Sequence, residues 1–458
     1  MPEIVSSDYI ERARVERGVD FGLRPAKRVV VTGLSNMTAF GGTQETWDAF
    51  LTDASGVREI PVMDGIKTTI AAPLPEGYNP MDFLHKDDER YGLSVLAALE
   101  IVKAREALAM AGLLDLGDQL INYRRIHPYW MTGTLASGLA AADQIIEIHK
   151  HVMVGRGSRI KPSLAQQIFP EEPAGRVAIA LGYQGRRSKS PFEACASSLS
   201  SVVEGVDILK QGFAQVVAVG GFETVLEIHP NEVLGVFSSM RALSERNDEP
   251  QKASRPFDKD RDGFVAASGG GVAILEDEEF ARARGAHILA EVVGVSKTQD
   301  GNALSFGANK PLTTEMDPVR VADTIVEAML TPDGKAVFMK PDVFWAHATS
   351  TQIGDLNESR AFRLAFGKHA DDILVTAIKS RIGHTLGGAG IVNFNLAIQS
   401  MLEGKVPSIL NLDNPDPEIG ELNYVRGNFR ETPVNKALVV AYGFGRYNAA
   451  VHVGRYIP

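Results

Sequence analysis

The chain has a single cysteine, Cys195, in 458 residues, which excludes an internal disulfide framework and any metal site built from paired cysteines. So few cysteines fit a reducing cytosol, and we expect a cytoplasmic location. No apolar run approaches the roughly 20 residues that span a bilayer. The first 24 residues mix acidic and basic side chains without an apolar core, so neither a signal peptide nor a transit peptide is expected.

Positive charge is also scarce. Lys and Arg number 47 against 57 Asp and Glu, which gives a formal net charge of −10. This balance argues against a nucleic-acid-binding surface, because such surfaces are basic. A local basic patch would still allow an acidic partner to bind. The hydrophobic content of 44% is an ordinary globular composition, sufficient for one large core or two medium ones.

Apolar segments alternate between strand-like and helix-like patterns, which predicts an α/β fold with buried sheets. Strands are expected at residues 27–33, 177–181, 216–221, 272–275, 288–295, 343–347, 373–377 and finally 437–442. Helices are expected at residues 94–114, directly after Cys195, and at 319–330 and 391–402. The segments form two series that look like related halves. We expect residues 1–26 to be an exposed arm.

Cys195 lies in the run Pro191–Ser200, where small residues are followed by apolar residues at helical spacing. A thiol at the start of a helix lies near the positive end of the helix dipole and near unpaired N–H groups, which favour the reactive thiolate. Most free cysteines, however, are small buried hydrophobes, and most histidines before glycine turns are structural. Three other segments therefore decide the interpretation of Cys195.

The first segment, Trp345–Glu358, places His347 at a strand end before a helix that begins with acidic residues. The second, Lys379–Gly390, places His384 in a turn of small residues, again before a helix. The third, Tyr442–Asn448, contains glycines that allow a close backbone approach and can aim N–H groups at a developing oxyanion. Together they predict that Cys195, His347 and His384 share one site.

In this order, the motifs resemble those of elongating β-ketoacyl-acyl-carrier-protein synthases, which have a thiolase fold. The resemblance covers nearly everything after Ala26 and extends to Arg241–Ser244, Ser254–Phe264 and Asn411–Glu418. Residues 237–264 and the Gly-Arg-Tyr near the C-terminus are most similar to actinobacterial, mycolate-type enzymes. The resemblance implies duplicated βαβ halves, residues 27–287 and 288–458, in a layered α-β-α-β-α architecture.

The resemblance also implies a decarboxylating Claisen condensation that extends an acyl chain by two carbons with malonyl-acyl carrier protein. Cys195 accepts the acyl group in this scheme, since a thiolate suits thioester exchange, and His347 and His384 stabilise an enolate. The remaining implied roles are electrostatic support of the histidines by Lys379, pairing of Glu358 with Lys379, an oxyanion hole from the N–H groups of Cys195 and Phe444, a gate formed by the Phe444 ring, pantetheine binding by Thr349 and Thr351, and an acyl-pocket wall at Phe237.

The implied partner is an acyl carrier protein, and no cofactor is implied beyond the carrier's own phosphopantetheine. Docking of this acidic protein requires local cations; the candidates, each of which could equally be an ordinary surface charge, are Lys86, Arg90, Arg156, Arg159 and Lys161. Family members are normally homodimers, and Val216–Val219 are the residues that we expect at the strand edge paired across the two-fold axis.

Four departures from the family pattern suggest an unusual acyl substrate or a specialised pathway. Gly445-Arg446-Tyr447 replaces the usual glycine-glycine-threonine, Ser268 stands where a carboxylate is usual, Ala348 replaces a glycine, and residues 297–310 lack the usual motif. Two alternative functions therefore remain: a ketosynthase-fold acyltransferase that does not elongate, and a non-catalytic partner subunit like a chain-length factor. A thiolase is less favoured, because its chemistry needs a second cysteine.

Two motifs imitate other binding sites. Asp258, Asp260 and Asp262 match the start of an EF-hand loop, but Gly269 stands where the loop needs a glutamate, so we expect no metal. The glycines of residues 383–390 have the wrong spacing for a dinucleotide-binding fingerprint.

Overall fold

The computed structural model describes residues 27–88, 92–114, 131–139, 142–183, 185, 187–300, 316–330 and 340–458. The expected N-terminal arm, the docking candidate Arg90 and residues 301–310 lie outside the described residues. Helices and strands alternate, which confirms the predicted α/β class. No helix in the described part of the chain combines the length and apolarity needed to cross a lipid bilayer.

Two series of strands repeat one pairing pattern. In the first series the order is β4 (Met131–Ala136), β5 (Val216–Glu223), β6 (Gly269–Asp277), β1 (Val29–Met37). In the second it is β9 (Leu374–Thr376), β8 (Val343–Trp345), β12 (Lys436–Gly443), β13 (Tyr447–Gly454), β7 (Ala290–Gln299). Each series has a parallel pair, β4–β5 or β8–β12, followed by two antiparallel pairings. This shared order is the duplication that the sequence predicts.

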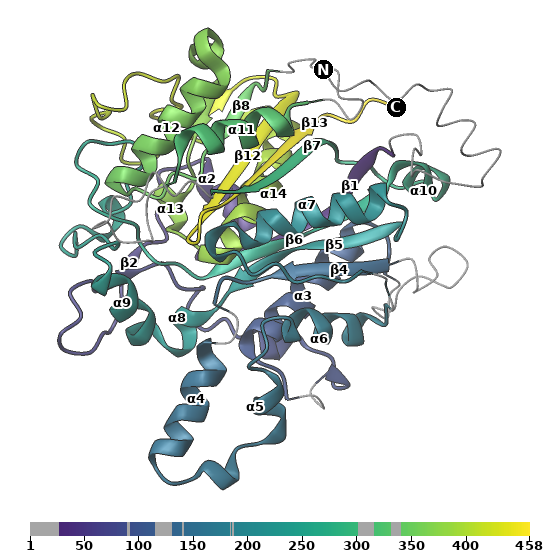
Figure 1. Cartoon of the computed structure of the whole chain (residues 1–458), viewed down its shortest axis with the longest axis vertical. Helices are drawn as coiled ribbons and strands as arrows, with labels where there is room; N and C mark the ends of the chain where they lie inside the picture. The colour runs from purple at the N-terminus through teal and green to yellow at the C-terminus, as the bar shows by residue number, and fades with distance from the viewer. Residues whose placement is uncertain are drawn as a thin grey trace, which may run out of the picture.

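Helices separate and cover the two series (Figure 1). Two central helices, α7 (Ser197–Lys210) and α14 (Ala389–Glu403), contact strands of both series and are buried along most of their length. Two helices, α3 (Val95–Met110) and α6 (Glu172–Leu181), cover the first series; α11 (Pro318–Ala328) and α12 (Gln352–Phe366) cover the second. The predicted α-β-α-β-α layering is therefore confirmed.

The two β layers are also joined into one sheet. Residues Val29–Val31 of β1 pair with Ala290–Val292 of β7, so hydrogen bonds run continuously through nine strands. The largest core cluster lies between the layers, around α7 and α14, and two further clusters lie beneath the outer helices. The predicted boundary between the two halves, at residues 287 and 288, stays a prediction.

The shorter elements are α2 (Thr43–Phe50), α4 (Ala142–Met153), α5 (Pro162–Gln166), α8 (Val225–Ile228), α9 (Pro230–Ser239), α10 (Glu278–Ala283), α13 (Lys379–Ile382), β2 (Arg58–Glu59), β3 (Ile70–Ala71), β10 (Lys405–Val406) and β11 (Arg430–Glu431).

One predicted strand is wrong. Residues 177–181 form the last turns of α6 rather than a strand. The buried residues Ala174, Val177 and Leu181 recur at helical spacing, whereas Ile179 is exposed. A short apolar run cannot distinguish a strand from a helix, and here the spacing of the buried side chains favours the helix.

Two further strand predictions are corrected. Residues 437–442 were expected to form the final strand of the chain, but the chain reverses after Gly443 and returns as β13. The expected dimer edge, Val216–Val219, lies in β5, which is paired on one side with β4 and on the other with β6. Sequence reasoning did not identify residues 131–136 as a strand, and therefore placed β5 at an edge that β4 occupies.

Candidate active site

Cys195 lies in a tight 3-10 turn, Ala194–Ala196, directly before α7. Ala194 has a φ of +49°, a left-handed conformation that is strained for a residue with a Cβ atom. The turn is fixed from α7, because the Ser197 hydroxyl accepts the Glu193 N–H at 2.9 Å and donates to the Ala194 carbonyl at 2.6 Å. The 3-10 turn before α7 therefore presents the Cys195 thiol, and the residue is only 7% exposed.

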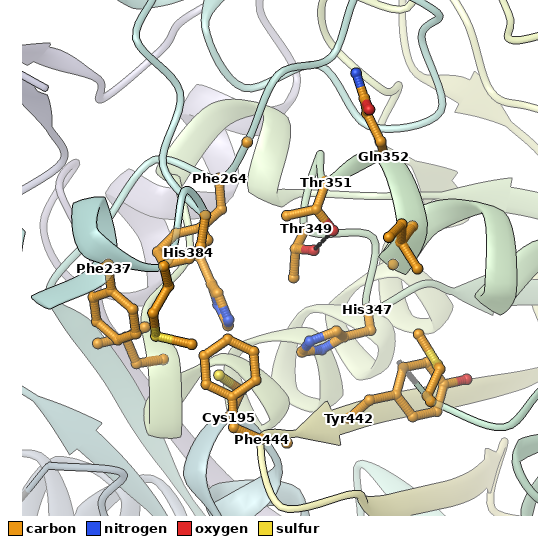
Figure 2. A pocket seen from close by; sticks show the side chains of 18 of the residues that line it. Cys195, Phe237, Phe264, His347, Thr349, Thr351, Gln352, His384, Tyr442 and Phe444 are labelled. Atoms are coloured by element: carbon orange, nitrogen blue, oxygen red, sulfur yellow. Dashed lines mark hydrogen bonds between the residues drawn. The ribbon is translucent and has the colours of Figure 1, made fainter. Parts of the chain in front are cut away.

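His347 and His384 reach the same place from the second series of strands. His347 follows β8, and His384 follows α13 and Gly383, whose φ is +68°. The two imidazole rings are 5.3 Å apart between centroids and nearly perpendicular, at 89°. Both rings point toward Cys195 (Figure 2), and all three side chains line one cavity of about 400 Å³. The structure thus brings together the three residues that the motifs pair.

Two buried charged side chains hold the backbone of His347. The Glu358 carboxylate, from α12, accepts the N–H groups of His347 and Ala348, each at 2.7 Å. The Lys379 ammonium donates to the His347 carbonyl oxygen. The resemblance implies that Glu358 pairs directly with Lys379, but among the described residues they form no ion pair. Each contacts the peptide groups of His347 instead, so both side chains fix the position of one histidine.

Burial sets the protonation of the histidine pair. It lowers the pKa of His347 and of His384 well below the ordinary 6.5, and the charge of Lys379 lowers both further. Both imidazoles are therefore neutral at physiological pH. Burial also lowers the pKa of Lys379 and raises the pKa of Glu358. A neutral imidazole carries one N–H, which is the donor that a developing enolate oxygen needs.

The pKa of Cys195 corrects the expectation of a thiolate. Burial raises the pKa of the Cys195 thiol to about 12, although three groups oppose it: the charge of Lys379 and the backbone N–H groups of Cys195 and Phe444. Burial outweighs these groups, so the thiol of the free site is neutral. The same two N–H groups both interact with the Cys195 side chain, which is the arrangement required of an oxyanion hole.

Phe444 and Phe237 line the cavity beside Cys195. Their ring centroids are 6.4 Å apart, and Phe264 lies 5.2 Å from Phe237 and 5.3 Å from the His384 ring. Gly443 allows Phe444 to approach the thiol, because a Cβ atom at Gly443 would lie 2.1 Å from the Glu193 carbonyl oxygen. The aromatic rings thus form an apolar wall at the nucleophile.

Thr349 and Thr351 lie on the opposite side of the cavity, with their hydroxyls 3.0 Å apart (Figure 2). Sequence reasoning did not single out Phe264 or Tyr442, which also line the cavity; the Tyr442 ring lies 5.4 Å from the His347 ring. Tyr442 is the last aromatic residue of β12 before the turn that carries Phe444, and the sequence carries no signal that its ring lies beside His347.

The missing carboxylate at Ser268 has a substitute. The Ser268 hydroxyl donates to the Glu227 carboxylate at 2.5 Å, and the same carboxylate accepts the Leu74 N–H at 2.8 Å. Glu227 belongs to α8, directly before the helix that carries Phe237. A carboxylate is therefore present at this point of the fold, but it comes from another segment of the chain.

The docking candidates lie away from the cavity lining. Lys86, Arg156, Arg159 and Lys161 are exposed, and the last three connect α4 to α5. These two helices project from the body of the molecule (Figure 1).

The motif that resembles an EF-hand loop makes structural contacts. The Asp258 carboxylate accepts hydrogen bonds from Arg255 and from the N–H groups of Asp413 and Asn414.

Comparisons with known proteins agree with this architecture. The N-terminal domain model of β-ketoacyl synthases matches residues 26–281, and the C-terminal domain model matches residues 289–413. A 3-oxoacyl-acyl-carrier-protein synthase 2 from Synechocystis sp. is 33% identical over 94% of this chain and 98% of its own length. A protein of the same name from Staphylococcus aureus is 30% identical over 93% of this chain and 97% of its own. The crystal structure of a β-ketoacyl synthase from Burkholderia phymatum is 28% identical, covers 94% of this chain and all of its own, and superposes with a TM-score of 0.82. The chain belongs to the β-ketoacyl synthase family.

Proposed function

We propose that this protein is an elongating β-ketoacyl-acyl-carrier-protein synthase. It condenses an acyl group held on Cys195 with malonyl-acyl carrier protein. The observation that carries the proposal is the single cavity lined by Cys195, His347 and His384, with the backbone N–H groups of Cys195 and Phe444 at the thiol. The names of the Synechocystis and Staphylococcus relatives support the same reaction.

Acyl transfer is the first step. The Cys195 sulfur attacks the carbonyl carbon of the acyl thioester, and the oxyanion accepts the two N–H groups. The bond to the carrier's sulfur then breaks, and the proton lost by Cys195 ends on the departing thiol. Because the pKa of Cys195 is raised, this proton must move during the attack, and the neutral imidazoles in the cavity are bases that can carry it.

Decarboxylation and condensation follow. The bond between the malonyl α-carbon and its carboxylate breaks, carbon dioxide leaves, and the electron pair forms an enolate whose oxygen accepts N–H groups from His347 and His384. The enolate carbon attacks the acyl carbonyl on Cys195, and the Cys195 sulfur leaves as a thiolate, which takes up a proton from solvent to restore the neutral thiol. The product is a β-ketoacyl thioester two carbons longer. Lys379 and Glu358 act as positioning residues, through the peptide of His347.

Intact-protein mass spectrometry tests the proposal. The purified protein is mixed with a panel of acyl-carrier thioesters, and malonyl-carrier protein is then added. We expect an acyl adduct that is absent in Cys195→Ala, and that disappears on malonyl addition as β-ketoacyl product forms. A stable adduct that malonyl does not discharge would identify an acyltransferase, and no adduct with any donor would identify a non-catalytic subunit. Homodimerisation, the carrier-docking cations and a cytoplasmic location stay predictions.

A further inference from the structure

Glu223 is a buried carboxylate close to the nucleophile that the steps above do not use. It is the last residue of β5 and is 1% exposed. Its Oε1 accepts three donors from the turn after β4. They are the Gly138 N–H, the Leu139 N–H at 3.1 Å and the Ser137 hydroxyl at 3.0 Å. One oxygen atom therefore fixes the turn that leads from β4 toward α4.

The same oxygen lies where two parts of the active site meet. A Cβ atom on Gly138 would lie 2.9 Å from Glu223 Oε1 and 3.2 Å from the carbonyl oxygen of the residue before Cys195. A Cβ atom on Gly387, in the loop after His384, would lie 2.6 Å from Oε1 and 2.2 Å from the Gly138 nitrogen. Glycines thus allow the carboxylate to pack closely against both the cysteine turn and the histidine loop.

No cation neutralises the carboxylate of Glu223. Among the described residues, no lysine or arginine forms an ion pair with it, and the charged groups that face it from α4 and α3 are the carboxyls of Asp143 and Glu100. Burial raises the pKa of Glu223 to about 7, and its charge in turn raises the pKa of the Cys195 thiol. A neutral amide oxygen accepts the same three donors, so the hydrogen bonds alone do not require a charged side chain here.

We propose that Glu223 is a positioning residue for Cys195 and that its negative charge restrains the reactivity of the thiol. Its hydrogen bonds hold the turn against which the cysteine turn packs. Its charge disfavours any negative charge that develops on the Cys195 sulfur, because like charges repel strongly in a buried region. The inference rests on the proposed function only in taking Cys195 as the reacting group.

The effect of Glu223 on Cys195 changes near neutral pH. Below the Glu223 pKa of about 7 the carboxyl is neutral, and only its hydrogen bonds act on the cysteine turn. Above this pH the carboxylate is charged, and the thiol reacts more slowly than it would beside a neutral group. Lys379 also acts on the thiol, and burial lowers the pKa of Lys379. The charge effect of Glu223 is therefore isolated by a ratio of two proteins that both contain Lys379.

Glu223→Gln removes the charge and keeps an amide oxygen for the three donors. Because Cys195 is the only cysteine of the chain, intact-protein mass spectrometry follows its alkylation by iodoacetamide without any substrate. We expect the variant and the wild type to react equally fast at pH 6, where Glu223 is mostly protonated. At pH 8 the variant should react about threefold faster. A ratio of the two rates that does not change with pH would overturn the proposal.

Glu223→Ala lacks both the charge and the acceptor oxygen. Its alkylation rate relative to the wild type should also rise about threefold between pH 6 and pH 8, so either variant decides the charge effect if the other does not fold. Loading of Cys195 from an acyl-carrier thioester needs a well-placed thiol and should be about tenfold slower in Glu223→Ala than in Glu223→Gln. Equal loading of the two variants would overturn the positioning role. If the wild type forms no acyl adduct, the proposed function fails, and the alkylation ratio still decides the inference.

Asp143→Asn is the matched control, because burial raises the pKa of Asp143 to about 7 as well. This carboxyl lies in α4 and acts on Glu223. Its removal should leave the alkylation rates at pH 6 and pH 8 equal to those of the wild type, since Glu223 is mostly protonated at the first pH and mostly ionised at the second. An acceleration at pH 8 as large as that of Glu223→Gln would assign the effect to buried negative charge in general and overturn the specific role of Glu223.

Discussion

Burial dominates the electrostatics of the individual site residues. It lowers the pKa of both histidines and of Lys379, and it raises the pKa of Cys195. The motifs predict which residues share the site, because their order along the chain resembles that of a known family. They cannot predict the direction of the cysteine shift, because desolvation depends on the surrounding packing, which motifs do not show.

The neutral histidines predict an unusual pH profile for malonyl decarboxylation. Since the pKa of His347 and of His384 lies well below 6.5, both imidazoles stay neutral as the pH falls from 7 to 6. We therefore expect kcat for carbon dioxide release to be flat over this range, measured with malonyl-carrier protein in excess. A several-fold loss by pH 6 would show histidines with ordinary pKa values and would contradict the burial argument.

Glu358 offers a test of how His347 is held. Glu358→Gln keeps one acceptor oxygen, so one of the N–H groups of His347 and Ala348 faces an amide donor. We expect a loss of about 1–3 kcal/mol in the free energy of unfolding, measured with urea, and a lower kcat with unchanged loading of Cys195. The exposed carboxylate Glu403, changed to Gln, is the control and should alter stability by less than about 0.5 kcal/mol. Equal stability of both variants would contradict the role.

At the scale of elements, periodicity predicts long helices and buried strands well and short apolar runs poorly. The helices at residues 94–114, 319–330 and 391–402 are confirmed as α3, α11 and α14, because their apolar residues recur over several turns. The run at residues 177–181 spans little more than one turn, so the alternatives of strand and helix fit it equally. The strand β13 was missed because the glycines before it were interpreted only as an oxyanion loop.

Close packing of the β12 end against the cysteine turn makes Gly443 sensitive to any side chain. In Gly443→Ala the new Cβ atom would lie 2.1 Å from the Glu193 carbonyl oxygen, so the turn that carries Cys195 must shift. We expect Cys195 acylation, followed by mass spectrometry, to slow by about 100-fold, because small misplacements of reacting groups have effects of this size. Gly175→Ala in α6, where a Cβ atom meets nothing within 4 Å, should acylate normally. Normal acylation of Gly443→Ala would contradict the packing.

At the scale of the whole molecule, the two related halves are predictable because each carries its own series of strand and helix patterns. Their joining through β1 and β7 is not, since strand pairing between distant segments leaves no local pattern. The mistaken dimer edge has the same cause. Whether a strand lies at the edge of a sheet depends on which other strands pair with it. The strand β4 pairs with the side of β5 that sequence reasoning had treated as unpaired.

Buried carboxylates predict that stability falls as the pH rises above 6.5. Burial raises the pKa of Glu223 and of Asp143 to about 7, so the folded protein binds protons that the unfolded chain has released. The stability that these protons provide is lost as the pH rises through the folded pKa. The buried histidines, whose pKa values are lowered, act in the opposite sense near pH 6.5, so the test compares two proteins. We expect the free energy of unfolding, from urea titrations, to fall between pH 6.5 and 8 by about 0.5–1 kcal/mol more in the wild type than in Glu223→Gln. An equal pH dependence of the two proteins would contradict the assignment.

Phe444 performs two tasks with one residue, because its N–H lies at the thiol and its ring lies against the acyl wall. A backbone rotation at Phe444 that displaced the ring would also turn its N–H away from the sulfur, whereas a rotation about the Cα–Cβ bond would move the ring alone. If the predicted gate at Phe444 opens by backbone rotation, admission of a chain and completion of the oxyanion hole are mutually exclusive states of one peptide.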